Sequence, residues 1–463
     1  MTSSRNRRPD LSGSGRLSDI DRDLIRVAQD PGFPRWLAQM RAIGGCAHPI
    51  YLAGHTTLVD GATGEMIRHY DTAEQSPGRA PIRCGNRRAS VCPTCARVHA
   101  GDTYHLIRAG LTGGKGTPST VGHPRLFVTL TAPSWGSVHR VSGRDRDRCR
   151  PRRSGGTCEH GRPVGCPQRH STSDPAVGTP LCRDCYDYVG HVLWHAHAGL
   201  LWTRTTHAIR RQLATRAGVP QSRLGDHAMV SFVKTAEYQR RGAVHIHAVV
   251  RLDGPDGPGS PPPWDAELLA AAVTSALAVS VSAPYSPATG ARVIRWGAQA
   301  DVRELESSAD TGPTADAVAA YIAKYVSKSV QESVHGVDYR ITSAEGIRLA
   351  PVPSHIRAIM AVCWRLGGLC EFAGLRLRAW AHTLGYRGHI LTKSRVYSTT
   401  FRELRSIRAQ FRSGPTPIGA HSESEWRYVG SGHSPGESAI AAGIAEDIAL
   451  SREHDDSGHE GNS

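Results

Sequence analysis

The sequence of 463 residues lacks any apolar run that approaches the roughly 20 residues needed to span a bilayer. Its first residues, Met1–Arg8, are polar and contain no hydrophobic core of the kind found in signal peptides. We therefore expect a soluble, cytoplasmic protein without a membrane partner. Because that compartment is reducing, the 11 cysteines are better interpreted as thiolates or metal ligands than as disulfides.

A nucleotide-binding P-loop is also absent from the sequence. No Gly-x4-Gly-Lys-Ser/Thr segment occurs, and the Gly-Gly-Lys-Gly run at Gly113–Gly116 has the wrong spacing. The chain therefore shows no ATP-driven helicase of this type, and unwinding of DNA would depend on a host helicase.

The charge of the chain is strongly positive and uneven. The formal net charge of +15 and the pI of about 9.6 favour a polyanionic partner, with nucleic acid the leading candidate. Residues 421–463 carry a net negative charge, because they contain many Asp and Glu residues and, besides histidine, only two basic residues, Arg427 and Arg452. We expect this acidic tail to be disordered.

The pattern of strands and helices predicts an α+β protein with a mainly antiparallel sheet and packed helices. We divide the chain into a polar, partly disordered N-terminal segment, a Cys-rich module, an α+β domain with a Cys-rich insertion, a helical and basic region that binds DNA, and the acidic tail. In this order the segments are residues 1–40, 41–120, 121–335 with the insertion at 140–190, 336–420 and 421–463.

A strand at Gly242–Val250 offers two histidines to one side of the predicted sheet. Because side chains alternate along a strand, His245 and His247 project from the same face. If the strand Val230–Tyr238 precedes it in a hairpin, Glu237 lies opposite His245, with Cβ atoms about 5 Å apart. Two imidazoles and a carboxylate could hold one divalent metal and leave coordination positions open. The alternative is a strand whose histidines merely face solvent.

A later helix offers two phenols to one place. Tyr321 and Tyr325 lie at i and i+4, Lys328 shares their face, and Lys324 flanks it. A lysine beside a phenol favours the ionised phenol and could stabilise charge on a phosphate. A metal together with a tyrosine suggests phosphoryl transfer with a protein nucleophile. The alternative is a pair of half-buried tyrosines next to solvated lysines.

Two groups of cysteines have spacings typical of structural zinc sites. The first group is Cys46, Cys84, Cys92 and Cys95. The second group is Cys158, Cys166, Cys182 and Cys185. We expect each group to hold one zinc ion and to stabilise a loop-rich region that lacks its own core, although buried, inert thiols would give the same sequence. His99 is a substitute ligand for the first group and Cys149 a spare ligand for the second.

A basic segment near the carboxyl end mixes cations with an aromatic residue. Arg387, Lys393 and Arg395 lie close to Tyr397, a composition suited to phosphate contacts and base stacking. We expect these three cations to bind DNA, while a solvated surface is an equally good interpretation.

The motifs together resemble a known family. Leu126–Thr131, then His245–His247, then Tyr321–Tyr325 are similar in order to the three motifs of the HUH endonucleases, in their rolling-circle replication-initiator branch. The chain most resembles the Rep proteins of actinobacterial plasmids and integrative elements, over roughly residues 40–400. Those proteins also contain short sequence segments similar to Cys84–Arg88, Cys92–Cys95, Leu181–Tyr188 and Trp380–His389.

The resemblance implies an HUH endonuclease-like fold and a nicking mechanism. His245 and His247 would bind Mg²⁺ or Mn²⁺ at the scissile phosphate of origin DNA that is single-stranded or cruciform at the nick. Tyr321 or Tyr325 would attack, leaving a 5′-phosphotyrosine and a 3′-hydroxyl for the host DNA polymerase, and the other tyrosine would cleave the regenerated origin. Glu237 as third ligand follows from the hairpin geometry and from acidic residues at similar offsets in related initiators.

Two other functions fit the same sequence. A transposase or relaxase of the HUH superfamily would share this chemistry and act on different DNA. A non-enzymatic, zinc-dependent DNA-binding regulator would use the cysteine modules and the basic segment, but would leave the histidines and tyrosines without a role.

Overall fold

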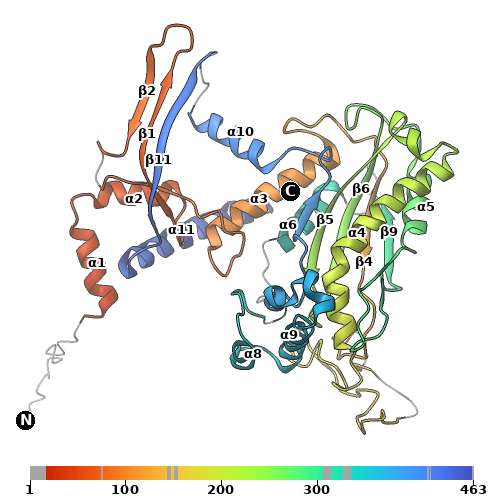
Figure 1. Cartoon of the computed structure of the whole chain (residues 1–463). Coiled ribbons are helices and arrows are strands. Elements are labelled where there is room, and N and C mark those ends of the chain that lie inside the picture. Colours follow the sequence, from red (N-terminus) through yellow and green to blue (C-terminus); the bar gives the residue numbers. More distant parts are fainter. Residues whose placement is uncertain are drawn as a thin grey trace, which may run out of the picture. The chain divides into compact units, whose positions relative to one another are not determined.

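The computed structural model describes residues 17–74, 77–142, 148–150, 155–305, 314–326, 334, 336–413, 417 and 419–460. These residues form an α+β protein with antiparallel sheets and packed helices, as predicted, and the chain divides into two compact units (Figure 1). One unit comprises Met1–His99 with Gln410–Ser463, and the other comprises Ala100–Ala409. In the described part of the chain, every helix is too short or too polar to cross a membrane.

The larger unit is built on a five-stranded antiparallel sheet in the order β10-β5-β6-β4-β9. Its strands are β4 (Arg125–Leu130), β5 (Met229–Tyr238), β6 (Val244–Asp253), β9 (Ala300–Glu304) and β10 (Leu391–Lys393). The strand with the histidines, β6, is therefore central, between β5 and β4 (Figure 1). A separate two-stranded ribbon contains β7 (Ser280–Ser282) and β8 (Val293–Arg295).

Helices cover both faces of this sheet. The face that carries Val244, Ile246 and Val250 packs in one large core with α4 (Tyr188–Arg216), α5 (Ala266–Ala276) and α9 (Ser354–Leu366). On the opposite face, Val233 and Val249 pack against α3 (Pro93–Thr112) and α6 (Ala315–Val326). His245 and His247 belong to this second face, so the predicted separation of histidines from core residues is confirmed.

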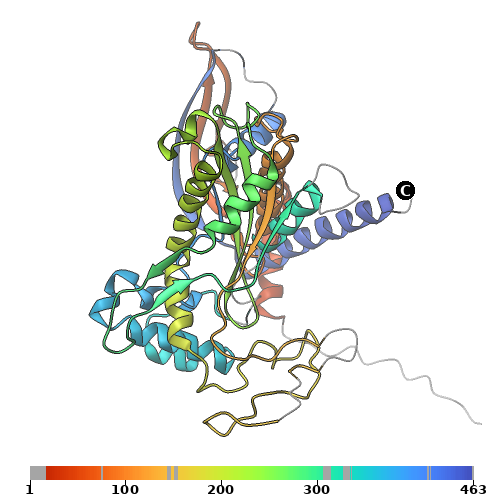
Figure 2. The same cartoon turned by 90° about the vertical axis from the view of Figure 1, so that its right-hand side faces the viewer.

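The chain between β4 and α4 is irregular. Its described residues form isolated bridges but no strand or helix, and they run as loops beside the start of α4 (Figure 2). The remaining short elements of the larger unit are η1 (Gln221–Asp226), α8 (Ala344–Leu349), η2 (Cys370–Leu375), η3 (Leu377–Thr383) and α10 (Phe401–Ser413), which ends beyond the unit.

The smaller unit corrects the prediction of an acidic disordered tail at 421–463. The described part of that tail forms β11 (His421–Ser431) and α11 (Pro435–Glu460). The other elements of the smaller unit are α1 (Asp19–Gln29), α2 (Phe33–Ala42), β1 (Ile50–Val59), β2 (Met66–Asp71) and β3 (Ala80–Ile82). β11 pairs with β1, more than 360 residues earlier in the chain (Figure 1). Ile440, Ile444 and Ile448 form a helical stripe in the core, which net charge alone does not reveal.

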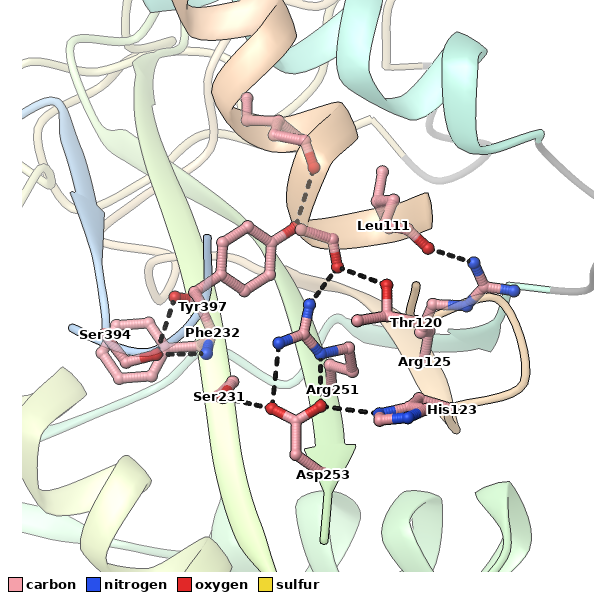
Figure 3. A network of polar contacts seen from close by, with 12 residues as sticks. Leu111, Thr120, His123, Arg125, Ser231, Phe232, Arg251, Asp253, Ser394 and Tyr397 are labelled. Atoms are coloured by element: carbon pink, nitrogen blue, oxygen red, sulfur yellow. Dashed lines mark hydrogen bonds and ion pairs between the residues drawn. The ribbon is translucent and has the colours of Figure 1, made fainter. Parts of the chain in front are cut away.

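A buried ion pair fixes one end of β6. Arg251 donates to both carboxylate oxygens of Asp253, at 2.6 and 2.9 Å, and to the carbonyl of Gly110 on α3. Asp253 also accepts from Ser231 Oγ at 2.6 Å and contacts His123 Nδ1 at 2.8 Å (Figure 3). Both members of the pair are fully buried, so the network joins α3, β5, β6 and the loop before β4 without access to water.

Three buried histidines hold the turn at the other end of β6. His191 Nε2 lies 3.3 Å from the carbonyl of Gly242, and His355 Nε2 lies 3.0 Å from that of Arg241. His195 Nε2 accepts a hydrogen bond of 3.0 Å from the first amide of β6. Burial lowers the pKa of His195 and of His355 to about 4, and it lowers the pKa of His191 well below its usual value. The turn is therefore held by neutral imidazoles.

Replacing Arg251 with methionine should lower the free energy of unfolding by about 3–5 kcal/mol, because the Asp253 carboxylate then stays buried without its partner. Urea denaturation followed by fluorescence measures this change. The matched control is Arg303→Met on β9, whose ion pair with Asp301 at 2.7 Å is largely exposed, with 66% and 47% of the two side chains accessible. The control should lose less than about 1 kcal/mol. Equal losses in the two variants would contradict the importance of the buried network.

Acidification from pH 7 to 4 should destabilise the larger unit. In the unfolded chain a histidine has a pKa near 6.5, so the unfolded state binds more protons than the folded state, in which the pKa of His195 is about 4. The stabilisation is complete above about pH 6.5 and is lost as the pH falls toward 4, on the order of 3 kcal/mol for this residue. Thermal unfolding against pH should show a shallower dependence in His195→Gln. His207→Gln, at an exposed position of the same helix, should keep the wild-type slope.

Candidate active site

The β5–β6 hairpin brings Glu237, His245 and His247 together. Glu237 is the register partner of His245, as the sequence predicted. The two imidazole rings have centroids 4.5 Å apart, and Glu237 Oε2 lies 3.5 Å from His247 Nε2. One carboxylate and two imidazoles thus project from adjacent strands onto the face of the sheet that α6 covers.

Helix α6 places a phenol against these histidines. The hydroxyl of Thr314 accepts from the backbone N–H of Ala317 at 3.1 Å and so caps the start of the helix. Because Val318 and Ile322 turn into the core, Tyr321 faces the sheet, and its hydroxyl lies 3.2 Å from His247 Nε2. The Tyr321 side chain remains 37% exposed, which leaves it accessible to a substrate.

Of the other predicted residues of the tyrosine helix, only Lys324 has a described side chain. Tyr325 belongs to α6 one turn after Tyr321, but its side chain lies outside the described residues, as does Lys328. Lys324 is exposed on the same helix.

Side chains from strand β4 and the hairpin turn contact His245 and His247, and none of them was predicted from the sequence. Thr129 is the register partner of His247, and its hydroxyl lies 3.2 Å from His247 Nδ1. The ring of Phe127 stacks on the His247 imidazole at 5.7 Å between centroids. Gln239 Nε2 lies 3.2 Å from His245 Nδ1. The alternation of Phe127 and Thr129 on β4, opposite the histidine strand, is the signal that would have identified them.

The electrostatics of the site favour a neutral imidazole at His245. Burial, with further contributions from His247 and Arg241, lowers the pKa of His245 to about 4. An imidazole that is neutral at physiological pH keeps a lone pair for a metal ion. Two imidazoles and a carboxylate suit a divalent cation such as Mn²⁺, and a carboxylate suits Mg²⁺. Within the described residues, this trio is not among the groups whose donor atoms all lie within 4.8 Å of one another.

A basic cleft of about 570 Å³ adjoins the histidines. Gln239, which contacts His245, lines the cleft together with Thr131 at the end of β4. Its cationic lining residues are Arg140, Arg150, Arg240 and Arg241. Arg241 donates to the carbonyls of Ala132 and Pro133 and so holds the hairpin turn against the end of β4. The cleft therefore offers positive charge to a polyanion next to the candidate site.

The first predicted cysteine group does come together. Cys46, Cys84, Cys92 and Cys95 have donor atoms within 4.8 Å of one another, with Cys46 as the fourth member rather than the substitute His99. The Cys46 sulfur lies 3.8 Å from that of Cys92 and 3.6 Å from that of Cys95. A tetrahedron with Zn–S bonds of about 2.3 Å has edges of about 3.8 Å, so the four thiols fit a structural zinc ion.

The second predicted group is divided between two clusters, which corrects the prediction. Cys158, Cys182 and Cys185 come together with His160. Cys166 instead lies in a further cluster with His139, Cys149 and His170, so Cys149 is a full member and not a spare. The reason is an antiparallel bridge between Arg150 and Cys166, which sets the sulfur of Cys166 beside Cys149. Cysteine spacing alone does not reveal the histidines of these two clusters, His139, His160 and His170.

The predicted DNA-binding cations differ in their surroundings. Arg387 and Arg395 are exposed. Lys393 is half-buried, and its ammonium donates to the carbonyls of Arg395 at 3.3 Å and Ser398 at 2.8 Å. Burial lowers the pKa of Lys393. Lys393 therefore holds the loop after β10, whereas the two arginines remain available to a partner.

Comparison with known proteins identifies the family of the chain. Residues 32–446 match the family described as "Replication initiator protein, pSAM2". Over 450 residues the chain is 44% identical to a replication initiator protein of Streptomyces ambofaciens, and the similarity covers 93% of this chain and 94% of that protein. No solved structure matches the chain. The chain therefore belongs to the pSAM2 family of replication initiator proteins.

Proposed function

We propose that this initiator starts rolling-circle replication by nicking, and later rejoining, one strand of origin DNA through a covalent link to Tyr321. The observation that carries the proposal is the contact of 3.2 Å between the Tyr321 hydroxyl and His247 Nε2. It brings a nucleophile from α6 to a pair of histidines on β6 and a carboxylate on β5, three elements that no local sequence pattern joins.

The residues divide the chemistry among them. Glu237, His245 and His247 are the ligands for Mg²⁺ or Mn²⁺, which when bound would polarise the scissile phosphate. The phenolic oxygen of Tyr321 forms a bond to phosphorus while the bond to the 3′ oxygen breaks. The proton lost by the phenol is balanced by the proton gained by the released 3′-hydroxyl, which primes the host DNA polymerase. Attack of a 3′-hydroxyl on the phosphotyrosine reverses the exchange, so joining needs no ATP.

Tyr325 and the two lysines complete the proposal. In initiators with two tyrosines, the second phenol cleaves the regenerated origin after one round, and we assign this step to Tyr325. Lys324 and Lys328 would stabilise negative charge on the phenol and on the phosphate in the transition state.

The basic cleft is the proposed path of the DNA strand. Arg140, Arg150 and Arg240 line it together with Gln239, which contacts His245, so a phosphate backbone lying in the cleft would pass near the histidines. Arg387 and Arg395 would add contacts to the DNA backbone. Zinc ions held by Cys46, Cys84, Cys92 and Cys95 and by Cys158, His160, Cys182 and Cys185 would stabilise the surrounding loops.

Membership of the initiator family favours replication over the transposase and relaxase alternatives, which share the chemistry. A regulator that only binds DNA remains the alternative of a different class, and it needs neither the phenol nor the histidines.

Tyr321→Phe should abolish nicking of supercoiled origin DNA in Mg²⁺ or Mn²⁺, with a loss of at least about 1000-fold, because the variant lacks the attacking oxygen. The readout is the nicked product and the protein–DNA adduct, with the modified peptide mapped by mass spectrometry. Tyr285→Phe, at an exposed position between β7 and β8, serves as the matched control and should nick normally.

Two outcomes would count against this assignment. An adduct that persists in Tyr321→Phe and disappears in Tyr325→Phe would make Tyr325 the first nucleophile. Origin binding without a nick or an adduct, under either metal, would favour the non-enzymatic regulator. His245→Ala should remove the adduct, because one proposed metal ligand is lost.

Arg240→Gln should weaken origin binding and lower the slope of log affinity against log salt by about one unit, because one phosphate contact is lost. Fluorescence anisotropy at several salt concentrations measures both quantities. Arg223→Gln is the matched control, since Arg223 is exposed, lies in η1 beyond the end of α4 and does not line the cleft. A salt slope that is unchanged in Arg240→Gln would place the DNA elsewhere.

A further inference from the structure

The cluster of His139, Cys149, Cys166 and His170 has the dimensions of a tetrahedral metal site. His139 Nδ1 lies 3.1 Å from His170 Nε2. The sulfur of Cys149 is 3.7 Å from His139 Nδ1, and the sulfur of Cys166 is 3.5 Å from His170 Nε2. With Zn–N bonds of about 2.0–2.1 Å and Zn–S bonds of about 2.3 Å, a tetrahedron has N–N edges of about 3.4 Å and N–S edges of about 3.6 Å. The three separations agree with these edges.

The surrounding contacts orient the donors toward one point. His170 Nδ1 contacts Asp174 Oδ2 at 2.7 Å, which directs Nε2 into the cluster, as a carboxylate does for many zinc-bound histidines. The backbone N–H of Arg140 donates to the Cys149 sulfur at 3.2 Å. Both cysteines are free and buried. A disulfide between them would leave the convergence of two imidazoles unexplained.

The order of the ligands along the chain adds a second argument. Ligand pairs alternate between this cluster and its neighbour: residues 139 and 149 belong to the first, 158 and 160 to the second, 166 and 170 to the first, and 182 and 185 to the second. Each cluster therefore closes a loop that contains a ligand pair of the other. Since the described residues between β4 and α4 form no helix or strand, two interlocked metal ions would supply the folding energy that a core supplies elsewhere.

We propose that His139, Cys149, Cys166 and His170 bind a zinc ion in addition to the two sites of the proposed function, and that the two ions of residues 139–185 form one cross-braced module. His139, Arg140 and Arg150 line the basic cleft, so this module forms one wall of it. The ion in this cluster holds two of the arginines in place beside the hairpin turn. The zinc assignment stands on the cluster geometry and does not depend on the nicking activity.

Zinc in the purified full-length protein, measured by inductively coupled plasma mass spectrometry, should amount to one ion for each of the three clusters. Cys149→Ser should lose at least one equivalent of zinc. The matched control is Cys370→Ser, an exposed cysteine outside the clusters, and it should keep the full amount. Full zinc content in Cys149→Ser would overturn the proposal. It would also be overturned if the wild-type protein contained two zinc ions and its Cys149 and Cys166 reacted with iodoacetamide under native conditions. Iron in place of zinc would overturn the choice of metal.

A second variant keeps the test decisive if Cys149→Ser does not fold. Asp174→Asn retains all four donors and should release one zinc ion to a chelator at a concentration about 10–100-fold lower than wild type. Asp184→Asn, at an exposed carboxylate in the same segment, should release zinc like the wild type. Identical release curves for Asp174→Asn and wild type would count against the inferred role of Asp174 in directing His170 to a zinc ion. Because the readout is zinc retention, it is separate from any failure of the nicking assay.

Discussion

The antiparallel register of β5 against β6 is the constraint on which the candidate active site depends. Glu237 faces His245 only in this register, and a slip of one residue would move one partner to the face that α4 covers. The register is fixed at both ends. At the turn, buried histidines hold the backbone carbonyls, and at the other end Ser231 on β5 and Arg251 on β6 meet at Asp253. The strands between these two anchors have little freedom to shift.

The site combines rigid and irregular parts of the chain. The histidines and the carboxylate lie on the two central strands, and Tyr321 lies on a helix that is anchored in the core by Val318 and Ile322, so the side chains of the candidate site are preorganised. The cleft beside them is instead walled by loops without regular structure. Such loops can present arginines to a phosphate backbone only if something other than a hydrophobic core holds them. The cysteine and histidine clusters have that role in our interpretation.

Sequence patterns predicted the hairpin, the tyrosine helix and the first cysteine group, because each follows from local periodicity or short spacing. They did not predict which ligands pair in residues 139–185, since the partition depends on the bridge between Arg150 and Cys166. Disorder was predicted after residue 420 because the acidic residues were counted without the isoleucine stripe of α11. Lys393 was assigned to DNA because composition does not show that its ammonium meets backbone carbonyls.

The energetics of the central strands also favour a catalytic role for the site. His247 is buried and His245 largely so, beside a carboxylate and a phenol, where valine or isoleucine would stabilise the sheet better. Polar groups withdrawn from water destabilise a fold unless they are satisfied, and such groups concentrate at functional sites. A protein that only bound DNA would have no need for them on the face opposite its main core. Family membership establishes that the chain is a replication initiator, and this arrangement of side chains is the physical reason to expect that initiation includes cleavage of a strand.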